Sequence, residues 1–224
     1  HGLVLLEGIK TAFCPGFGKL LELARSGAIG NIRYVDACFT KLESAESREL
    51  NDRTYGGSFT ELGSYCLLPV IKLLGNGFED IRFESIKGDN GLDVFTTASF
   101  RYPGGLAAVV CGLGVKAEGR LMIAGTNGYV IAQAPWWKTT DMEVHYENPL
   151  EVDKVSEPFQ GDGLRYEIQA FLNMVNKKGD WGLGSSYGMR EDYGVHGFGM
   201  TPEDSITLAD IMGRFMEKEG RDQG

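Results

Sequence analysis

The stretch at residues 94–113, VFTTASFRYPGGLAAVVCGL, decides the fold class of this chain. Two strand-like runs lie on either side of Pro103-Gly104-Gly105, and a tripeptide so rich in proline and glycine is typical of a tight turn. Two strands joined by so short a connection pair in antiparallel fashion. The pattern therefore predicts adjacent antiparallel strands at residues 94–102 and 106–113.

Strand patterns continue on both sides of this hairpin. Further strands are predicted at residues 3–13, 32–42, 80–86, 119–124, 129–133 and 142–146. Thr126-Asn127-Gly128 provides a second tight turn, whereas residues 43–55 are polar and predict an irregular connection. The short turns indicate a sheet that is predominantly antiparallel.

Two helices are predicted in the first third of the chain. Pro15 can open the first, because the first helical turn does not need its missing N–H, and Gly27 ends it. Apolar residues recur at helical spacing at positions 17, 20, 21 and 24. The second helix covers residues 58–74 and ends at Gly75.

Two further amphipathic helices are predicted around residues 164–175 and 206–216. Thr201 is expected to cap the last helix, with Asp204 three residues later. Between these helices, residues 179–200 contain seven glycines and few aliphatic residues, which favours a long loop.

Together these elements predict an α+β fold, with one large open, predominantly antiparallel sheet and helices on one face. Residues 1–224 are long enough to bury a core and are expected to form a single domain. The second face of the sheet needs a cover, for which a partner subunit is expected. Trp136 and Trp137 are expected at that interface.

The composition excludes several classes of protein. The chain is 42% hydrophobic and 24% charged, as in ordinary globular domains, and its formal net charge is -9. That charge disfavours nucleic acid and anionic membranes as partners, and no apolar run reaches the ~18 residues of a membrane span. The four cysteines form no C-x-x-C pair, which predicts reduced core thiols in a cytoplasmic protein.

Two glycine motifs suggest other chemistries but lack the surroundings that those chemistries need. Gly16-Phe17-Gly18 is similar to a dinucleotide-binding loop, yet Leu21 stands where the third glycine belongs, so an ordinary helix start is preferred. Residues 184–188, GSSYG, match the G-x-S-x-G pattern of serine hydrolases, with Asp192 and His196 following in order. That motif needs a strand before it and a helix after it to hold the serine on a strained turn, and the sequence around Ser186 predicts neither. A loop is therefore preferred.

The three histidines show no metal-ligand spacing, and no metal site is predicted. His145 is expected to be a half-buried polar residue on a strand.

Residues 55–65, YGGSFTELGSY, form the strongest candidate site. A double glycine leads into a helix that carries Glu61 and Tyr65, and their four-residue spacing places both side chains on one helical face. A carboxylate and a phenol so placed can share a proton or hold a substrate hydroxyl. The structural alternative is a capping box formed by Ser58 and Glu61 at the start of the helix.

This segment resembles the second domain of the glucose-fructose oxidoreductase / inositol dehydrogenase / rhizopine catabolism (Gfo/Idh/MocA) family. That domain carries the pattern GG-x-hydrophobic-x-D-x-G-x-H/Y, in which Glu61 takes the aspartate position and Tyr65 the His/Tyr position. Residues 7–15, 26–32, 125–128 and 201–205 are similar to further family patterns in the same order. Ala12 departs from the arginine that is usual in the first of them.

The resemblance implies the C-terminal domain of a two-domain oxidoreductase, without the N-terminal Rossmann domain and its active-site lysine. NAD or NADP is then expected in the full-length protein, and neither cofactor binding nor activity is expected of this fragment alone. The chain begins at His1 and runs straight into apolar residues, so upstream sequence is expected to have been removed. The family's open sheet implies a homodimer through that face.

The implied reaction is hydride transfer between a secondary alcohol carbon of a sugar or polyol and a nicotinamide ring. The resemblance implies Tyr65 as the acid/base and Glu61 as its orienting or substrate-binding neighbour. Lys10, Arg53 and Tyr55 are the candidates for binding substrate hydroxyls. The alternative function is a non-catalytic dimerisation or ligand-binding module of a multidomain protein.

Overall fold

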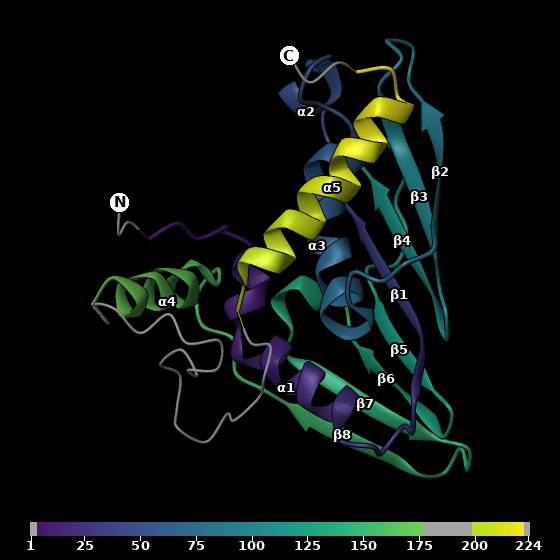
Figure 1. Ribbon diagram of the computed structural model, residues 1–224, viewed down its shortest axis with the longest axis vertical. Coiled ribbons are helices and arrows are strands. Elements are labelled where there is room, and N and C mark those ends of the chain that lie inside the picture. The colour runs from purple at the N-terminus through teal and green to yellow at the C-terminus, as the bar shows by residue number, and fades with distance from the viewer. Residues whose placement is uncertain (1–3, 177–198, 222–224) are drawn as a thin grey trace.

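The computed structural model describes residues 4–176 and 199–221 (Figure 1). The elements follow in the order η1 (Lys10–Phe13), α1 (Pro15–Arg25), β1 (Ile32–Thr40), α2 (Arg48–Asn51), α3 (Ser58–Leu74), β2 (Asp80–Lys87), β3 (Asp93–Tyr102), β4 (Gly105–Gly112), β5 (Leu121–Gly125), β6 (Gly128–Ala132), η2 (Trp136–Lys138), β7 (Asp141–Tyr146), β8 (Val152–Ser156), α4 (Leu164–Asn176) and α5 (Pro202–Lys218). Within this part of the chain, no helix has the length and apolarity needed to cross a bilayer.

The eight strands form one sheet in the order β2-β3-β4-β1-β5-β6-β7-β8. The pair β1–β4 is parallel and the other six pairs are antiparallel. The hairpin β3–β4 pairs Tyr102 with Gly105 across the predicted turn. The α+β prediction and the predominantly antiparallel sheet are therefore confirmed.

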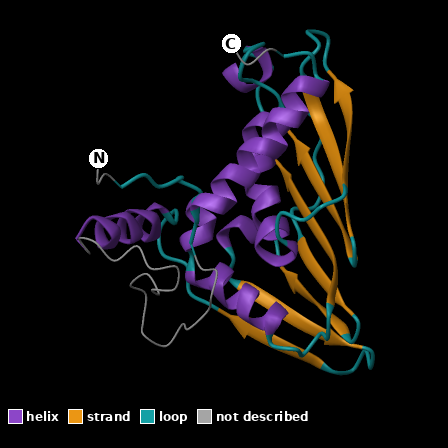
Figure 2. Ribbon diagram, viewed as in Figure 1, coloured by secondary structure: helices purple, strands orange, loops and turns teal. Residues whose placement is uncertain are grey.

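Helices α1, α3 and α5 lie on one face of the sheet, and the core lies between the two layers (Figure 2). In β1, Val35, Ala37 and Phe39 join this core, so the intervening Asp36 faces the other side, because successive side chains of a strand alternate. Asp36 pairs there with Arg120 at 2.6 Å. No described helix covers that second face (Figure 2).

Helix α1 forms as its sequence predicts. Pro15 is its first residue, and the stripe at positions 17, 20, 21 and 24 is buried. Gly16 and Gly18 lie in its first turn, and a Cβ added to Gly16 would lie 2.0 Å from the carbonyl oxygen of Thr139. The Gly16-Phe17-Gly18 stretch is thus an ordinary helix start packed against backbone, as preferred.

Helix α4 lies apart from the sheet, beside the N-terminal segment (Figure 1). The five residues of its predicted apolar stripe are 38–49% exposed: Leu164, Ile168, Phe171, Leu172 and Val175. The helix prediction is confirmed, but within the described residues its apolar face has no cover.

Several local predictions are wrong. Residues 4–9 form no strand, and Lys10–Phe13 is a 3-10 helix, because this apolar segment packs against the helical layer and has no strand beside it. Strand β8 and the short helix α2 were not predicted, since both are polar and β8 is an edge strand. Trp136 is fully buried and does not lie at an exposed interface.

Candidate functional site

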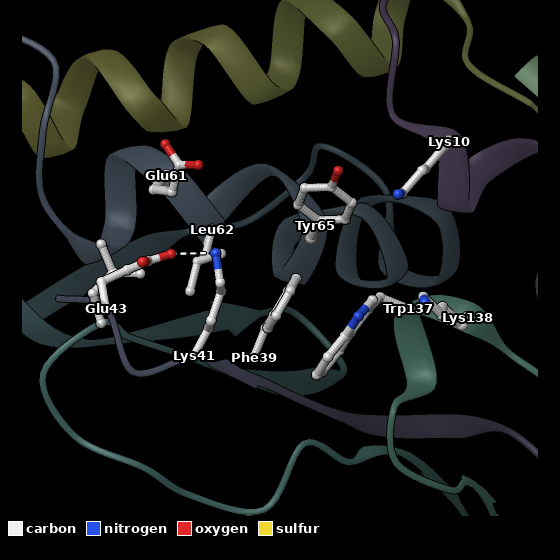
Figure 3. A pocket seen from close by; sticks show the side chains of 10 residues that line it. Lys10, Phe39, Lys41, Glu43, Glu61, Leu62, Tyr65, Trp137 and Lys138 are labelled. Carbon is white, nitrogen blue, oxygen red and sulfur yellow. Dashed lines mark ion pairs between the residues drawn. The ribbon is translucent and has the colours of Figure 1, made fainter. Parts of the chain in front are cut away.

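One pocket of about 180 Å3 opens beside the first turns of α3 (Figure 3). Its lining comes from η1, β1, α3, η2 and the segments that follow β1 and β4. The lining residues are Lys10, Phe39, Lys41, Glu43, Glu61, Leu62, Tyr65, Leu113, Trp137 and Lys138. The volume is smaller than the ~300–1,000 Å3 of typical small-molecule sites, so it suits a single ring rather than a dinucleotide.

The start of α3 is fixed by a buried aspartate. Gly57, the N-cap residue, has φ +106°, a conformation that glycine adopts readily. The Asp93 carboxylate accepts a hydrogen bond from the backbone N–H of Phe59 at 2.8 Å. Arg221 donates to Asp93 at 3.0 Å and to the carbonyl oxygen of Gly56 at 2.6 Å. These contacts set the direction in which α3 leaves the double glycine, and hence where Glu61 and Tyr65 point.

This arrangement replaces the capping box that was the structural alternative for Ser58 and Glu61. The N-cap of α3 is Gly57, and no side chain of its own caps the helix. Ser58 instead accepts a hydrogen bond from the backbone N–H of Leu113 at 3.0 Å. Glu61 is therefore free of a capping role, and its carboxylate lines the pocket.

An aromatic wall forms one side of the pocket. The rings of Phe39 and Trp137 stack with centroids 3.6 Å apart, and Tyr65 meets Phe39 edge to face at 5.6 Å. The indole N–H of Trp136 donates to the Cys38 carbonyl at 2.8 Å, which holds η2 against β1. Such a wall offers a flat apolar surface to the ring of a ligand.

A second contact ties the two 3-10 helices together. The hydroxyl of Thr11 in η1 donates to the carbonyl oxygen of Trp137 in η2 at 2.9 Å. Lys10 and Lys138, which flank these two residues in sequence, both line the pocket. Figure 3 shows Lys10 extending toward the side of the pocket where the Tyr65 hydroxyl lies.

Other charged groups lie on the far side of the pocket. Lys41 forms an ion pair with Glu43 (Figure 3), and Arg48 lies 3.7 Å from the carboxylate of Glu61. Arg48 is exposed, so its attraction for Glu61 is weak and screened by solvent.

The phenol of Tyr65 is set up as a proton donor. Burial raises its pKa above the ordinary value of 10.0, and the negative charges of Glu167 and Glu61 raise it further. At neutral pH the hydroxyl is therefore protonated in this chain. It can donate a proton to an oxygen that gains negative charge, and it needs a nearby cation before it can act as a base.

Comparison with known proteins identifies this architecture. Residues 17–131 match the family described as the GFO/IDH/MocA C-terminal domain. The chain belongs to this family.

Curated relatives of this GFO/IDH/MocA domain include two trans-1,2-dihydrobenzene-1,2-diol dehydrogenases. The protein from Oryctolagus cuniculus is 28% identical over 184 residues, covering 79% of this chain and 56% of its own length. The protein from Homo sapiens is 29% identical over 183 residues, covering 79% and 55%. The chain thus spans a little over half the length of these relatives.

Solved structures show the same fold. A 3-ketoreductase from Actinomadura kijaniata, in complex with NADP and TDP-benzene, superimposes with TM-score 0.70 at 18% identity, covering 95% of this chain and 61% of that one. An aldose-aldose oxidoreductase from Caulobacter crescentus, complexed with glycerol, gives TM-score 0.69 at 16% identity, covering 98% and 63%.

The pocket brings together three of the five predicted site residues of this GFO/IDH/MocA domain. Glu61, Tyr65 and Lys10 line it, whereas Arg53 and Tyr55 do not. Both of the latter are exposed on the turn before Gly56, Tyr55 to 67%. Their role stays a prediction, and nothing in the pocket depends on them.

Sequence reasoning missed several residues of this site. The stacked pair Phe39 and Trp137 comes from segments almost a hundred residues apart, and no local pattern joins them. Asp93 and Arg221, which fix the start of α3, lie 34 and 165 residues from their partners Phe59 and Gly56. The sequence contained one sign of such a contact, the pair Gly56-Gly57, because glycine is common where another part of the chain approaches the backbone closely.

The starts of α1 and α3 do not fit the phosphates of a dinucleotide. The N-terminus of α3 is occupied by the Asp93 carboxylate, and a Cβ on Gly57 would lie 2.1 Å from it. The N-terminus of α1 abuts the carbonyl oxygen of Thr139. Phosphates need open backbone N–H groups at such a terminus, so neither of these two helix starts offers a place for NAD(P).

The remaining motifs contribute no chemistry to the described structure. Residues 184–188, Asp192 and His196 of the hydrolase-like motif lie outside the described residues. His145 is half-buried, as expected, and stacks on Tyr129. Over residues 4–176 and 199–221, no three His, Cys, Asp or Glu side chains are grouped to hold a metal ion. The four cysteines are buried and unpaired.

Proposed function

We propose that this chain is the substrate-binding domain of an NAD(P)-dependent oxidoreductase that acts on a sugar, a polyol or a related secondary alcohol. The observation that carries the proposal is that Glu61 and Tyr65 project from one face of α3 into one small pocket with an aromatic wall. The family membership and the activities named for the relatives support the reaction class.

In the proposed reaction, NAD(P) would be held by another domain and would supply the hydride chemistry. The residues of this chain bind the substrate and handle the proton. The substrate ring lies against Trp137, Glu61 accepts a hydrogen bond from one hydroxyl, and Tyr65 faces the oxygen on the reacting carbon. In the direction of carbonyl reduction, Tyr65 donates the proton that this oxygen takes up.

The proposal includes a second domain that contacts this one. The exposed apolar stripe of α4 supports it, because contiguous apolar surface of this kind marks an interaction site. A cation from that domain near Tyr65 would lower the pKa of the phenol and let it act as a base in alcohol oxidation.

The proposal also includes a homodimer formed through the uncovered sheet face. Leu106 lies on that face, because its neighbour Ala107 joins the core, and it is 54% exposed. We expect Leu106→Glu to shift sedimentation from dimer to monomer, while Leu150→Glu, on a connection between two strands, leaves the dimer intact. A monomeric wild-type protein would remove this part of the proposal. The buried, unpaired cysteines support a reducing compartment such as the cytoplasm.

Steady-state kinetics test the function. The full-length protein that contains this chain is assayed with sugars and polyols in the presence of NAD+ or NADP+. Tyr65→Phe is expected to lower kcat about 10²–10⁴-fold with little change in KM, since it removes the proton donor and keeps the ring. Tyr146→Phe, which does not alter a residue that lines the pocket, serves as the matched control.

Two results would overturn the proposal. One is a folded full-length protein that neither quenches the fluorescence of NADH or NADPH on mixing nor turns over any alcohol. The other is a Tyr65→Phe variant with unchanged kcat, which would favour the non-catalytic ligand-binding module instead.

A further inference from the structure

The pocket contains two lysines whose charge is not neutralised by an ion pair. Three lysines line it, and Lys41 is paired with Glu43. Within residues 4–176 and 199–221, neither Lys10 nor Lys138 has a carboxylate at ion-pair distance. Among the described residues, the pocket therefore presents two lysines that have no ion-pair partner.

The nearest acids do not remove this imbalance. Glu61 lies beside Arg48 across the pocket. Glu167 of α4 interacts with Lys10 from beyond ion-pair distance, and burial raises the pKa of this carboxyl group. Glu167 therefore offsets the charge of Lys10 only from a distance, without forming an ion pair with it.

The two lysines are held on the same side of the pocket. They belong to η1 and η2, which the bond from Thr11 to Trp137 ties together. In Figure 3, Lys10 lies above Trp137 and Lys138 lies beside it, both on the side of the pocket opposite the Lys41–Glu43 pair. One face of Trp137 is covered by Phe39, so a ring bound beside Trp137 would lie on the side of the pocket that carries both lysines.

We infer that the pocket prefers a cyclic hydroxylated substrate that carries an anionic substituent, a carboxylate or a phosphate, between Lys10 and Lys138. The rest of the chain makes this local excess of positive charge distinctive, because the net charge of -9 repels anions in general. Charge-assisted hydrogen bonds to an anion are about twice as strong as neutral ones, so they set the preference. The inference deepens the proposed function and rests on it for the reaction, but anion binding is a property of the pocket itself.

Isothermal titration calorimetry of the 224-residue chain tests the inference with three probes at low salt. D-glucose is neutral, D-glucuronate carries a carboxylate and D-glucose 6-phosphate carries a phosphate. We expect at least one anionic probe to bind about tenfold or more tightly than glucose, and the two anions distinguish the kind of substituent. The preference should weaken as salt is added.

Charge variants assign the effect to the two lysines. The double variant Lys10→Gln/Lys138→Gln should lose the preference, whereas Lys10→Arg/Lys138→Arg should keep it. The double variant Lys19→Gln/Lys154→Gln changes the net charge equally outside the pocket and should keep it as well. Equal thermal melting of the four proteins excludes unfolding as the cause.

Three outcomes would overturn the inference. They are equal binding of glucose and both anions, an anion preference that survives Lys10→Gln/Lys138→Gln, and no anion binding at millimolar concentration. Each leaves the proposed function standing if the full-length protein oxidises a neutral polyol in a Tyr65-dependent manner. Conversely, if the chain binds the anions but the full-length protein turns over no alcohol, the proposed function is contradicted and the inferred anion preference is kept.

Discussion

The carboxylate of Asp93, on β3, accepts a hydrogen bond from the backbone N–H of Phe59 at 2.8 Å. This contact couples a strand at one side of the sheet to the first turn of the helix that carries Glu61 and Tyr65. Asp93 is fully buried, and its other oxygen pairs with Arg221, whose side chain is also largely buried. The stability of the domain and the geometry of the pocket thus depend on the same ion pair.

Asp93→Asn is expected to lower the free energy of unfolding by about 3 kcal/mol, because removing one partner of a buried pair leaves the other uncompensated. Urea denaturation measures the loss. Asp80→Asn breaks an exposed pair with Arg82 and should cost less than about 1 kcal/mol. Equal losses of unfolding free energy would show that the buried Asp93–Arg221 pair stabilises the fold no more than an exposed pair.

Gly57→Ala is expected to destabilise the domain more than Gly75→Ala. Both glycines have positive φ, so each substitution strains the backbone by about 1–3 kcal/mol. At Gly57 the new Cβ would also meet the Asp93 carboxylate, whereas at Gly75 it would meet nothing within 4 Å. Backbone strain is common to both variants, so the difference between their melting temperatures measures the steric clash with Asp93. Equal melting temperatures would contradict the close contact between Gly57 and Asp93.

Tyr102→Phe is expected to change how stability depends on alkaline pH. Burial raises the pKa of Tyr102 to about 12, and its hydroxyl donates to the carbonyl oxygen of Gly75 at 3.0 Å. Because the folded pKa lies above the unfolded value near 10, the contribution of Tyr102 is complete below pH ~10 and is lost as pH rises through about 12. The variant should be about 1 kcal/mol less stable at pH 8 and show a smaller further loss above pH 10. If the free energy of unfolding falls equally with pH above 10 in the wild type and the variant, the raised pKa of Tyr102 is contradicted.

A double-mutant cycle on Lys72 and Asp204 is expected to give a coupling free energy of about 0.5–3 kcal/mol. The Lys72 side chain is 3% exposed and meets Asp204 at 2.5 Å, while Asp204 also accepts from the backbone N–H of Thr201 in a capping box. Asp204→Ala should therefore cost more in the wild-type background than in Lys72→Met. A coupling of zero would mean that the capping bond alone accounts for Asp204.

The elements that the sequence predicted well are those specified by local pattern. Helix α3 has the predicted bounds because Gly57 and Gly75 stand at its two ends. The hairpin β3–β4 follows from its turn, and the Thr201–Asp204 capping box follows from the residue types at N-cap and N3. In each case the deciding contacts lie within a few residues of one another.

The predictions that failed needed long-range information. Residues 4–9 are as apolar as a strand, but an apolar run does not say whether a neighbouring strand is available to pair. Trp136 was expected at the interface that covers the second sheet face, yet its side chain is fully buried and its indole N–H donates to the carbonyl oxygen of Cys38, 98 residues away in sequence. The capping box of Ser58 and Glu61 was plausible locally, but Asp93 takes that place.

The same limit applies to the candidate site. Spacing alone placed Glu61 and Tyr65 together, since residues four apart share a helical face. It gave no means of separating Lys10, which reaches the pocket, from Arg53 and Tyr55, which do not. Phe39, Trp137 and Lys138 come from two segments that no motif marked.

Arg221 gives the pocket a dependence on the far end of the chain. Arg221 follows α5 and donates hydrogen bonds to both the Asp93 carboxylate and the carbonyl oxygen of Gly56. Removal of the chain from Arg221 onward would release the first turn of α3 and misalign Glu61 and Tyr65, without altering either residue. An affinity tag attached downstream of Arg221 leaves these hydrogen bonds in place, so recombinant versions of the protein should retain the arginine.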